Sequence, residues 1–483
     1  MWRNLLLLHR YLGIAVGLVV AAWCLSGVVM MYVPYPELGR SEELRALDPL
    51  NLDGCCTTAR GSGSPDLLVS LEVIDHFVLE MSADRLVVRL VTHEQGAHHI
   101  DLTEGEVIRN VSVERAEQIA LAFGQRLELG GEVEYRGAIE RDQWTVQSMY
   151  HPHRPLYHFA AGDDASTEWY VSSKTGQVVL VTTGSQRFWN RLGAVVHWLY
   201  PTILRQHAAA WNQTVVWVSV LGLFLTLTGV VVGIGQLRIR TSGRRSPYRG
   251  LALWHHYAGL IFGLLTLTWL FSGLMSMNPW GALEGRSYRA ERSRLQGPGL
   301  SGQQLRDYMT SLRGLTLPEH TVRLEGSVFL GRPYLLAWSA DGSATRLSAE
   351  SFRPEELAEA DFREAARSLR PDAYIADEGW LLQEDAYYYS HHNERDFPVY
   401  RVRYEDGEHL YLDAVSGAFL HGADQGRRRY RWFFSALHSG DFSPLLRSRP
   451  LWDVVMLLLL SGVTVGAVSG VVLAKRRLFG SRR

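Results

Sequence analysis

Four long apolar runs without charged residues interrupt the mixed pattern of polar and apolar positions along this 483-residue chain. Each run is about 20 residues long, which is the length that an α-helix needs to cross the hydrocarbon core of a bilayer. No small-residue cleavage site follows the first run, so we interpret it as a retained span rather than a signal peptide. The predicted spans are Tyr11–Tyr32, Val215–Leu237, Tyr257–Met277 and Val454–Ala474.

Two long polar segments, 34–184 and 279–427, separate these spans in pairs. Within them, apolar and polar residues alternate at 154–181 and 397–420, and turns rich in Asp and Gly flank the alternation, which is typical of β-hairpins. Helical periodicity precedes each hairpin. We therefore expect each segment to fold as a small α+β domain. The predicted helices are 112–124 and 353–370.

Large parts of the sequence occur twice. Residues 5–18 (LLLLHRYLGIAVGL) match residues 251–264 (LALWHHYAGLIFGL), which places His9 on His255, and a second match places His197 on His438. Both halves then cross the membrane twice in the same direction. We predict a tandem repeat whose halves are related by a pseudo-twofold axis along the membrane normal. Further matched pairs are Ser26 with Ser272, Gly27 with Gly273, Trp211 with Trp452, Thr228 with Ser469, and Gly229 with Gly470.

The predicted fold class is an α-helical four-span bundle that carries two exported α+β domains. Its organisation follows from the spans and the repeat. The predicted parts are transmembrane helix 1 (1–33), the first exported domain (34–184), an outer amphipathic helix with transmembrane helix 2 and a cytoplasmic link (185–250), transmembrane helix 3 (251–278), the second exported domain (279–427), and an outer helix with transmembrane helix 4 and a basic tail (428–483).

Charge is balanced overall, with 49 Lys and Arg against 50 Asp and Glu, but it is distributed unevenly. The link RIRTSGRRSPYR and the tail AKRRLFGSRR carry basic residues and no acid. The positive-inside rule therefore predicts that both chain ends and this link are cytoplasmic. The exported segments are left with a net acidic charge, which argues against nucleic acid as a partner and leaves membrane lipid as the expected one.

The three cysteines provide little information about the fold. Cys24 lies in the first span, and Cys55 and Cys56 are adjacent in an exported segment, where neighbouring cysteines rarely form a bridge. The chain has no CxxCH motif, so covalent attachment of a c-type haem is excluded.

The repeated histidines are the main candidates for chemistry. Under a twofold axis, His9 faces His255 near the cytoplasmic side, and His197 faces His438 near the outer side. Two facing imidazoles can supply both axial ligands of a b-type haem in a helix bundle. The alternatives are interfacial polar residues, or zinc or copper ligands; ionisable residues within membrane spans are more often functional. His256 is a reserve ligand in place of His255.

Four glycines near the cytoplasmic pair leave space for a flat macrocycle or serve helix packing, two interpretations that the sequence leaves open. Exported histidines are interpreted as surface residues. No GxGxxG fingerprint is present, so the first electron donor is a separate molecule. The glycines are Gly13, Gly17, Gly259 and Gly263, and the exported histidines are His98, His99, His151, His153, His158, His391 and His392.

The motif H-R-Y-L-G-x-x-x-G, its copy at the third span, the stretches VVHW and ALHSG, and the P-x-Y hairpins resemble the PepSY-associated transmembrane family. That family includes bacterial inner-membrane reductases of ferric siderophores. The resemblance implies periplasmic PepSY-type domains and two haems b held by His9, His255, His197 and His438. It also implies a cytoplasmic reductant or quinol as donor and a ferric siderophore as periplasmic acceptor. The alternatives are a membrane-anchored PepSY binding or regulatory module without redox activity, and a transporter subunit.

Overall fold

The structure is a computed structural model that describes residues 2–52, 73–92, 96–237, 245–312, 315–390 and 395–479. Several residues named above lie outside these described ranges. They are Cys55, Cys56, His391, His392, and the link residues Arg238, Arg240 and Arg244.

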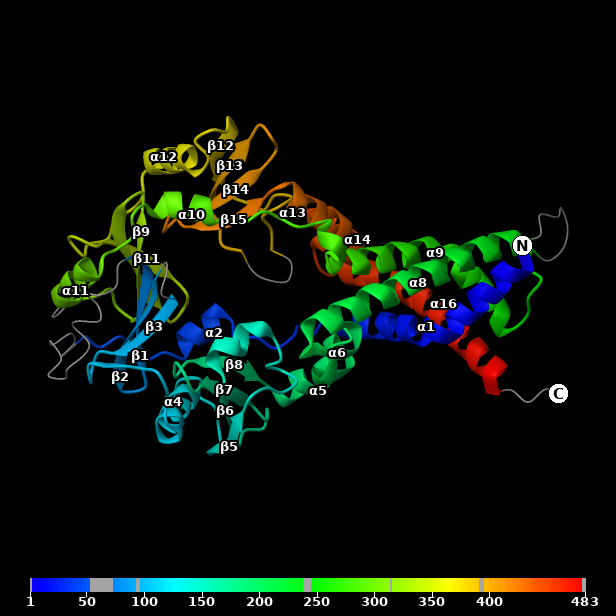
Figure 1. The fold of residues 1–483 in the computed structure, drawn as a ribbon, viewed down its shortest axis with the longest axis horizontal. Coiled ribbons are helices and arrows are strands. Elements are labelled where there is room, and N and C mark those ends of the chain that lie inside the picture. Colours follow the sequence, from blue (N-terminus) through cyan, green and yellow to red (C-terminus); the bar gives the residue numbers. More distant parts are fainter. Residues whose placement is uncertain are drawn as a thin grey trace.

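Four long apolar helices form a bundle, and each is long and apolar enough to cross a membrane, which confirms the predicted spans. Each helix packs against two others in the cyclic order α1, α8, α9, α16, so α1 and α9 stand diagonally across the bundle. Both described chain ends lie at the end of the bundle far from the sheets (Figure 1). The helices are α1 (Trp2–Met30), α8 (Ala208–Gln236), α9 (Leu251–Ser276) and α16 (Leu451–Phe479).

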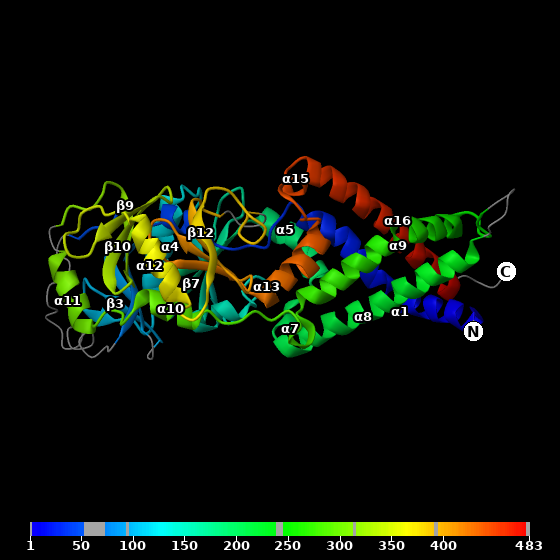
Figure 2. The same cartoon turned by 90° about the horizontal axis from the view of Figure 1, so that it is seen from above.

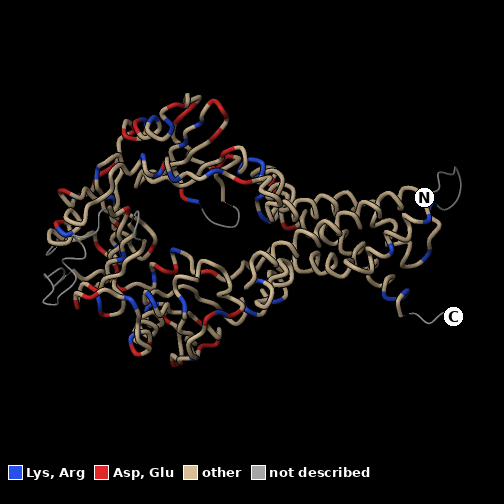
Figure 3. The backbone as a smooth tube through the Cα atoms, in the orientation of Figure 1, with Lys and Arg blue, Asp and Glu red and all other residues tan. Residues whose placement is uncertain are grey.

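The outer surface of the bundle is apolar. Large side chains such as Leu18, Ile261 and Leu458 are mostly exposed on it. A long stretch of the bundle carries no charged colour in Figure 3, whereas Lys and Arg appear near the chain ends. Such a surface has no favourable contact with water and is suited to contact with lipid.

The two polar segments share one seven-stranded antiparallel sheet, in the order β11-β10-β9-β1-β2-β3-β4. β1 of the first segment pairs with β9 of the second, so the two segments are joined rather than folded as independent domains. This pairing leaves neither strand with an open edge. The strands are β1 (Ile74–Ser82), β2 (Arg85–Thr92), β3 (Gly96–Asp101), β4 (Glu106–Val107), β9 (Thr321–Phe329), β10 (Arg332–Ser339) and β11 (Ala344–Ser348).

The seam between β1 and β9 is packed as a core. Phe77 and Leu79 on β1 are fully buried, as is Leu324 on β9. Gly326 on β9 gives the Phe77 ring its space, because a Cβ at this position would overlap the ring. Side chains of both segments therefore form one apolar cluster.

Each segment also has its own four-stranded sheet, ordered β5-β6-β7-β8 in the first and β12-β13-β14-β15 in the second. One helix packs on each sheet: Phe123 of α4 contacts Trp169, and Phe362 of α12 contacts Tyr400. The elements are α4 (Val113–Arg126), β5 (Val133–Ile139), β6 (Leu156–Ala161), β7 (Glu168–Ser172), β8 (Val178–Thr182), α12 (Glu359–Leu369), β12 (Ile375–Leu381), β13 (Val399–Tyr404), β14 (His409–Asp413) and β15 (Phe419–Ala423).

The hairpins and the helix at 112–124 match the sequence prediction, but α12 begins six residues later than predicted. Pro354 instead forms a β-bridge with Leu347, which holds the preceding residues extended. The helix begins after Ala358, whose backbone N–H donates to the Asp361 carboxylate at 2.8 Å. The capping carboxylate thus decides the start, not the apolar periodicity.

Short helices connect the sheets to the bundle, and both sheet-bearing segments lie at the same end of it (Figure 2). α5 (Gly184–Leu192) ends at Gly193, where a Cβ would lie 2.9 Å from Val29 of α1. This close approach lays α6 (Ala194–His197) against α1. In the second segment, α13 (Gln425–Tyr430), a π-helical stretch (Arg431–Ala436) and α14 (Leu437–Ser439) follow β15.

Candidate functional site

His9 and His255 face each other across the centre of the bundle. They lie on the diagonal helices α1 and α9, and their ring centroids are 6.2 Å apart with an angle of 30° between the rings. The two histidines that were predicted to face each other therefore do so in the structure. Neither histidine has a carboxylate beside it among the residues that the structure describes.

Each of these rings is held by the helix that follows its own span in the chain. The Nδ1 atom of each points at a backbone carbonyl and at a hydroxyl of that neighbouring helix. The acceptors are Leu225 O (3.1 Å) and Thr228 Oγ1 (3.5 Å) of α8 for His9, and Gly466 O (2.9 Å) and Ser469 Oγ (3.3 Å) of α16 for His255.

These contacts determine where the ring proton sits. A carbonyl accepts only, so Nδ1 must carry the proton. The Thr228 hydroxyl already donates to Phe224 O, and the Ser469 hydroxyl donates to Val465 O, so both present lone pairs to the rings. Nε2 of each imidazole then carries the free lone pair and is the atom that a metal ion binds. In known metal sites, a hydrogen bond from the other ring nitrogen orients the histidine in the same way.

Glycine on the neighbouring helix makes room for each inner ring. A Cβ at Gly229 would lie 2.7 Å from Cε1 of His9, and a Cβ at Gly470 would lie 3.0 Å from Cε1 of His255. Any larger residue there would push the imidazole out of its position.

His197 and His438 form a second pair at the other end of the bundle. Their ring centroids are 6.0 Å apart, with the rings inclined at 73°. Nδ1 of His197 lies 3.1 Å from Trp23 O and 3.2 Å from Ser26 Oγ, and Nδ1 of His438 lies 3.0 Å from Ser272 Oγ. Both serines donate to carbonyls of their own helices, so they also accept from Nδ1. The outer pair thus presents Nε2 in the same way as the inner pair.

Two tryptophans hold the turns that carry the outer pair. Trp211 Nε1 donates to Trp198 O at 2.8 Å, and Trp452 Nε1 donates to Ser439 O at 2.7 Å. Each accepting carbonyl belongs to the residue directly after a histidine. The sequence analysis did not predict the role of these tryptophans or of Ser26, Ser272, Thr228, Ser469, Gly229 and Gly470, although all of them occupy matched positions of the predicted repeat.

The spacing within both pairs fits one metal ion between two imidazoles. With metal–nitrogen bonds of about 2.0 Å, such rings have centroids roughly 6 Å apart. The described residues contain no group of three or more His, Cys, Asp or Glu side chains that could hold a metal ion without a cofactor. A haem needs only two axial protein ligands, so the donor sets fit haem better than zinc or copper.

His256 has different surroundings from His255. It is buried, its Nδ1 lies 2.8 Å from Ser246 Oγ, and its Nε2 lies 2.8 Å from Gly233 O. Both ring nitrogens are engaged, and the side chain ties the start of α9 to the end of α8. The geometry therefore favours His255 over the reserve ligand His256.

The two pairs lie far apart along the bundle. His9 and Ser26, which contacts His197, are 17 residues apart on α1, and this separation corresponds to roughly 25 Å of helix.

Of the four glycines near the inner pair, only Gly259 has no neighbouring atom within 4 Å of an added Cβ. Gly263, in contrast, packs closely on Val230, as a helix-packing glycine does.

The histidines of the first polar segment have structural contacts. Burial, together with the charge of Arg89, lowers the pKa of His99 to about 4. His158 lies 3.1 Å from Glu168 and stacks on Tyr170. His99 and His158 are thus partly buried, whereas the structure leaves His151 exposed as expected.

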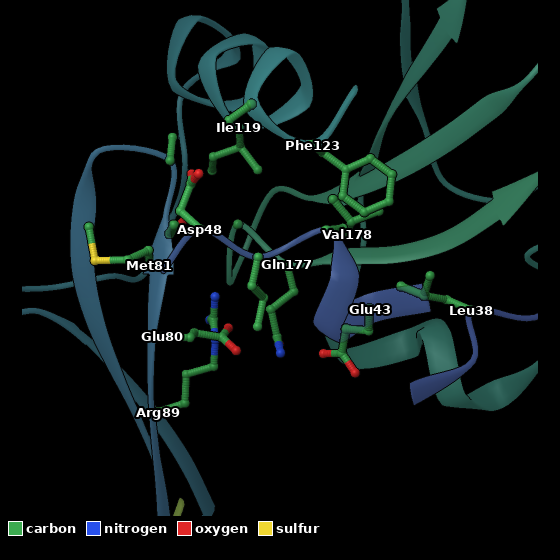
Figure 4. Close-up of a pocket in the computed structure, with 16 residues that line it drawn as sticks. Leu38, Glu43, Asp48, Glu80, Met81, Arg89, Ile119, Phe123, Gln177 and Val178 are labelled. Carbon is green, nitrogen blue, oxygen red and sulfur yellow. The ribbon is translucent and has the colours of Figure 1, made fainter. Parts of the chain in front are cut away.

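A small cavity of about 60 Å³ lies between α2 (Arg40–Arg45), β1 and α4. Figure 4 shows Glu80, Arg89 and Glu43 pointing into it. It has room for one or two waters and is too small for a cofactor. A larger cavity of about 440 Å³ lies beside the outer histidine pair and is described below.

No protein-family model matches this chain, and a search of curated proteins finds no similar sequence.

Proposed function

We propose that this chain is a di-haem b reductase of a bacterial inner membrane, and that it passes electrons to iron(III) in a periplasmic siderophore. The observation that carries the proposal is the two facing imidazole pairs, 6.2 Å and 6.0 Å apart, at opposite ends of one apolar bundle. Membership of the PepSY-associated transmembrane family is part of the same proposal.

The residues have defined tasks in this mechanism. His9 and His255 would hold the inner haem, and His197 and His438 the outer one. Each haem would supply one-electron chemistry at its site. The carbonyls and hydroxyls at Nδ1 fix the tautomer and the orientation of the imidazoles, and the apolar helices exclude water and ions from the space between the pairs.

The proposed topology places His9 and His255 near the cytoplasm, where a reductant or quinol delivers electrons, and the sheets in the periplasm. Iron(II) has a lower charge than iron(III) and binds hard oxygen ligands less tightly, so reduction releases the metal from an oxygen-rich chelator. The halves of the chain would be tandem repeats about an axis along the membrane normal, which explains why each histidine and its partners occur twice.

The first test is a visible absorption spectrum of the purified full chain, oxidised and then reduced with dithionite, with haem quantified. We expect sharp bands of reduced b-type haem and two haems per chain. His9→Ala and His438→Ala should each remove one. A colourless protein made with ample haem would refute the reductase and favour a membrane-anchored PepSY binding module.

A further inference from the structure

A cavity of about 440 Å³ opens beside the outer histidine pair, within the range typical of small-molecule sites. Its walls come from the β12–β13 connection, β15, α13 and the π-helical stretch Arg431–Ala436. π-helical turns are often found at functional sites. The lining residues are Tyr387, Tyr389, Arg395, His421, Ala423, Arg427, Tyr430, Arg431, Phe434, Ser435 and Ser439.

The cavity is positively charged. Three arginines and no acidic residue line its described walls. Arg431 pairs with Asp441 at 3.2 Å, and Arg427 Nη1 donates to Gly422 O at 3.0 Å, but no ion pair joins Arg395 or Arg427 to a carboxylate of the described residues. Burial lowers the pKa of His421 to about 4; Arg395 and Arg427 contribute to the decrease, whereas Asp385 and Asp424 act against it.

Arg431 supplies a second, independent indication of a ligand. It is only 6% exposed; its Nε donates to Ala386 O and its Nη2 to Asp441, but its Nη1 has no hydrogen-bond partner in the described structure. A buried charged donor without a partner is unfavourable unless something binds it. Because Arg431 also lines the cavity, a rotation of its guanidinium group would bring this donor to an anionic oxygen bound there.

The corresponding positions in the first half lack these features. In the alignment of the two halves, His421 corresponds to Leu180, Arg427 to Gln186 and Arg431 to Asn190. Trp198 stands for Ser439 and packs on Tyr35, so this region is filled by an aromatic cluster. Among the described residues, the cationic lining of this cavity therefore has no counterpart at the matching positions of the first half.

We propose that this cavity binds the electron acceptor, and that the acceptor is an oxygen-rich organic anion with planar groups, such as an iron(III) catecholate chelate. This inference rests on the proposed reductase function. The arginines bind the negative oxygens, and the Tyr and Phe rings pack on planar groups. Phe434 lies 5.2 Å, centroid to centroid, from His438, so a chelate against Phe434 is one side chain away from an outer histidine.

Binding of iron(III) chelates to the oxidised, haem-loaded full chain in detergent tests this assignment without requiring turnover. Equilibrium dialysis would use iron(III) 2,3-dihydroxybenzoate, an anionic aromatic chelate, and neutral iron(III) acetohydroxamate. Loss of one charged hydrogen bond should weaken binding of the anionic chelate roughly tenfold in Arg395→Gln and in Arg427→Gln. Arg429→Gln is the matched control, because Arg429 is exposed on α13 and does not line the cavity. Binding of the neutral chelate should be weak and unchanged.

Three outcomes would overturn the assignment: equal binding by all variants, equal binding of the two chelates, or variants that shift only the outer haem potential. The last would mean that the arginines serve haem carboxylates. Failure of the reductase proposal is distinguishable, because a haem-free preparation whose chelate binding still depends on Arg427 would keep the cavity assignment and refute the redox function.

Discussion

His255 and His256 are adjacent in the chain, but their nitrogen contacts differ. His255 has one nitrogen held by α16, and its ring centroid lies 6.2 Å from that of His9, whereas both nitrogens of His256 are held by Ser246 and Gly233. We expect His255→Ala to reduce the haem content from two to one per chain. His256→Ala should retain both haems and lower the free energy of unfolding by about 1–3 kcal/mol, because buried polar partners lose their hydrogen bonds.

Haem quantification and thermal denaturation of the two variants separate these effects. If His256→Ala loses a haem while His255→Ala keeps both, the assignment of the inner ligand is wrong.

Gly229 is a residue-scale test of the inner pair that leaves the ligand itself intact. A Cβ there would lie 2.7 Å from His9 and would displace the ring, so Gly229→Ala should lower inner-haem occupancy. Gly39→Ala is the control, because an added Cβ there would meet no atom within 4 Å and Gly39 lies outside the four helices of the bundle. Reduced-minus-oxidised difference spectra measure both. Equal haem content in the two variants would show that glycine at 229 has no role in placing His9.

At the scale of elements, one buried ion-pair cluster joins the halves. Arg323 on β9 contacts Glu80 on β1 at 2.7 Å and Glu43 on α2 at 2.6 Å, and Glu80 also pairs with Arg89. Removing one partner of a buried pair costs about 3–5 kcal/mol, because a charge is left uncompensated.

We therefore predict that Arg323→Ala lowers the free energy of unfolding of the sheet region by roughly 3 kcal/mol. Arg332→Ala, which removes a half-exposed pair with Asp361, should cost less than about 1 kcal/mol. Differential scanning calorimetry of the full chain compares them. Similar losses in both variants would mean that the cluster does not stabilise the seam between β1 and β9.

The same cluster predicts a pH dependence. Burial alone would raise the pKa of Glu80, but Arg89 and Arg323 more than offset this, and the pKa lies below its usual 4.5. A lowered carboxyl pKa stabilises the fold fully above the unfolded-state value, and this stability is lost as the pH falls through the folded-state value. The melting temperature should therefore decrease as the pH is lowered below about 4.5. Glu80→Gln should have a lower melting temperature at neutral pH and a flatter acid dependence; an unchanged dependence would contradict the assignment.

The sequence was sufficient to predict the four spans, the two hairpin regions and the four paired histidines, because apolar run length, alternation and repetition are all local or self-similar signals. The shared sheet could not be predicted in this way. β1 pairs with β9, a strand more than 200 residues away in the chain. The alternation of apolar and polar residues in one strand does not indicate which other strand it pairs with. The cationic cavity was also missed, because its arginines come from separate elements and only the fold collects them.

At the scale of the whole molecule, the distribution of charge and the arrangement of the elements indicate the same orientation in the membrane. Both described chain ends lie at one end of the bundle, and the sheets lie at the other (Figures 1 and 3). If the end with the chain termini is cytoplasmic, electrons enter near His9 and leave near His438. If the orientation were reversed, the sheets and the cationic cavity would face the cytoplasm, where a periplasmic acceptor could not reach them.

Single cysteines distinguish the two orientations. In a background with Cys55→Ser and Cys56→Ser, Arg363→Cys places an exposed thiol on α12, and Lys475→Cys places one at the end of α16. A membrane-impermeant maleimide, applied to cells with a permeabilised outer membrane, should label Arg363→Cys at once and Lys475→Cys only after the inner membrane is broken, because a charged reagent does not cross the bilayer core. The native Cys24 is buried within α1 and serves as an internal negative control. The opposite labelling order would reverse the electron path and refute the proposed periplasmic acceptor, while leaving the two histidine pairs as haem sites.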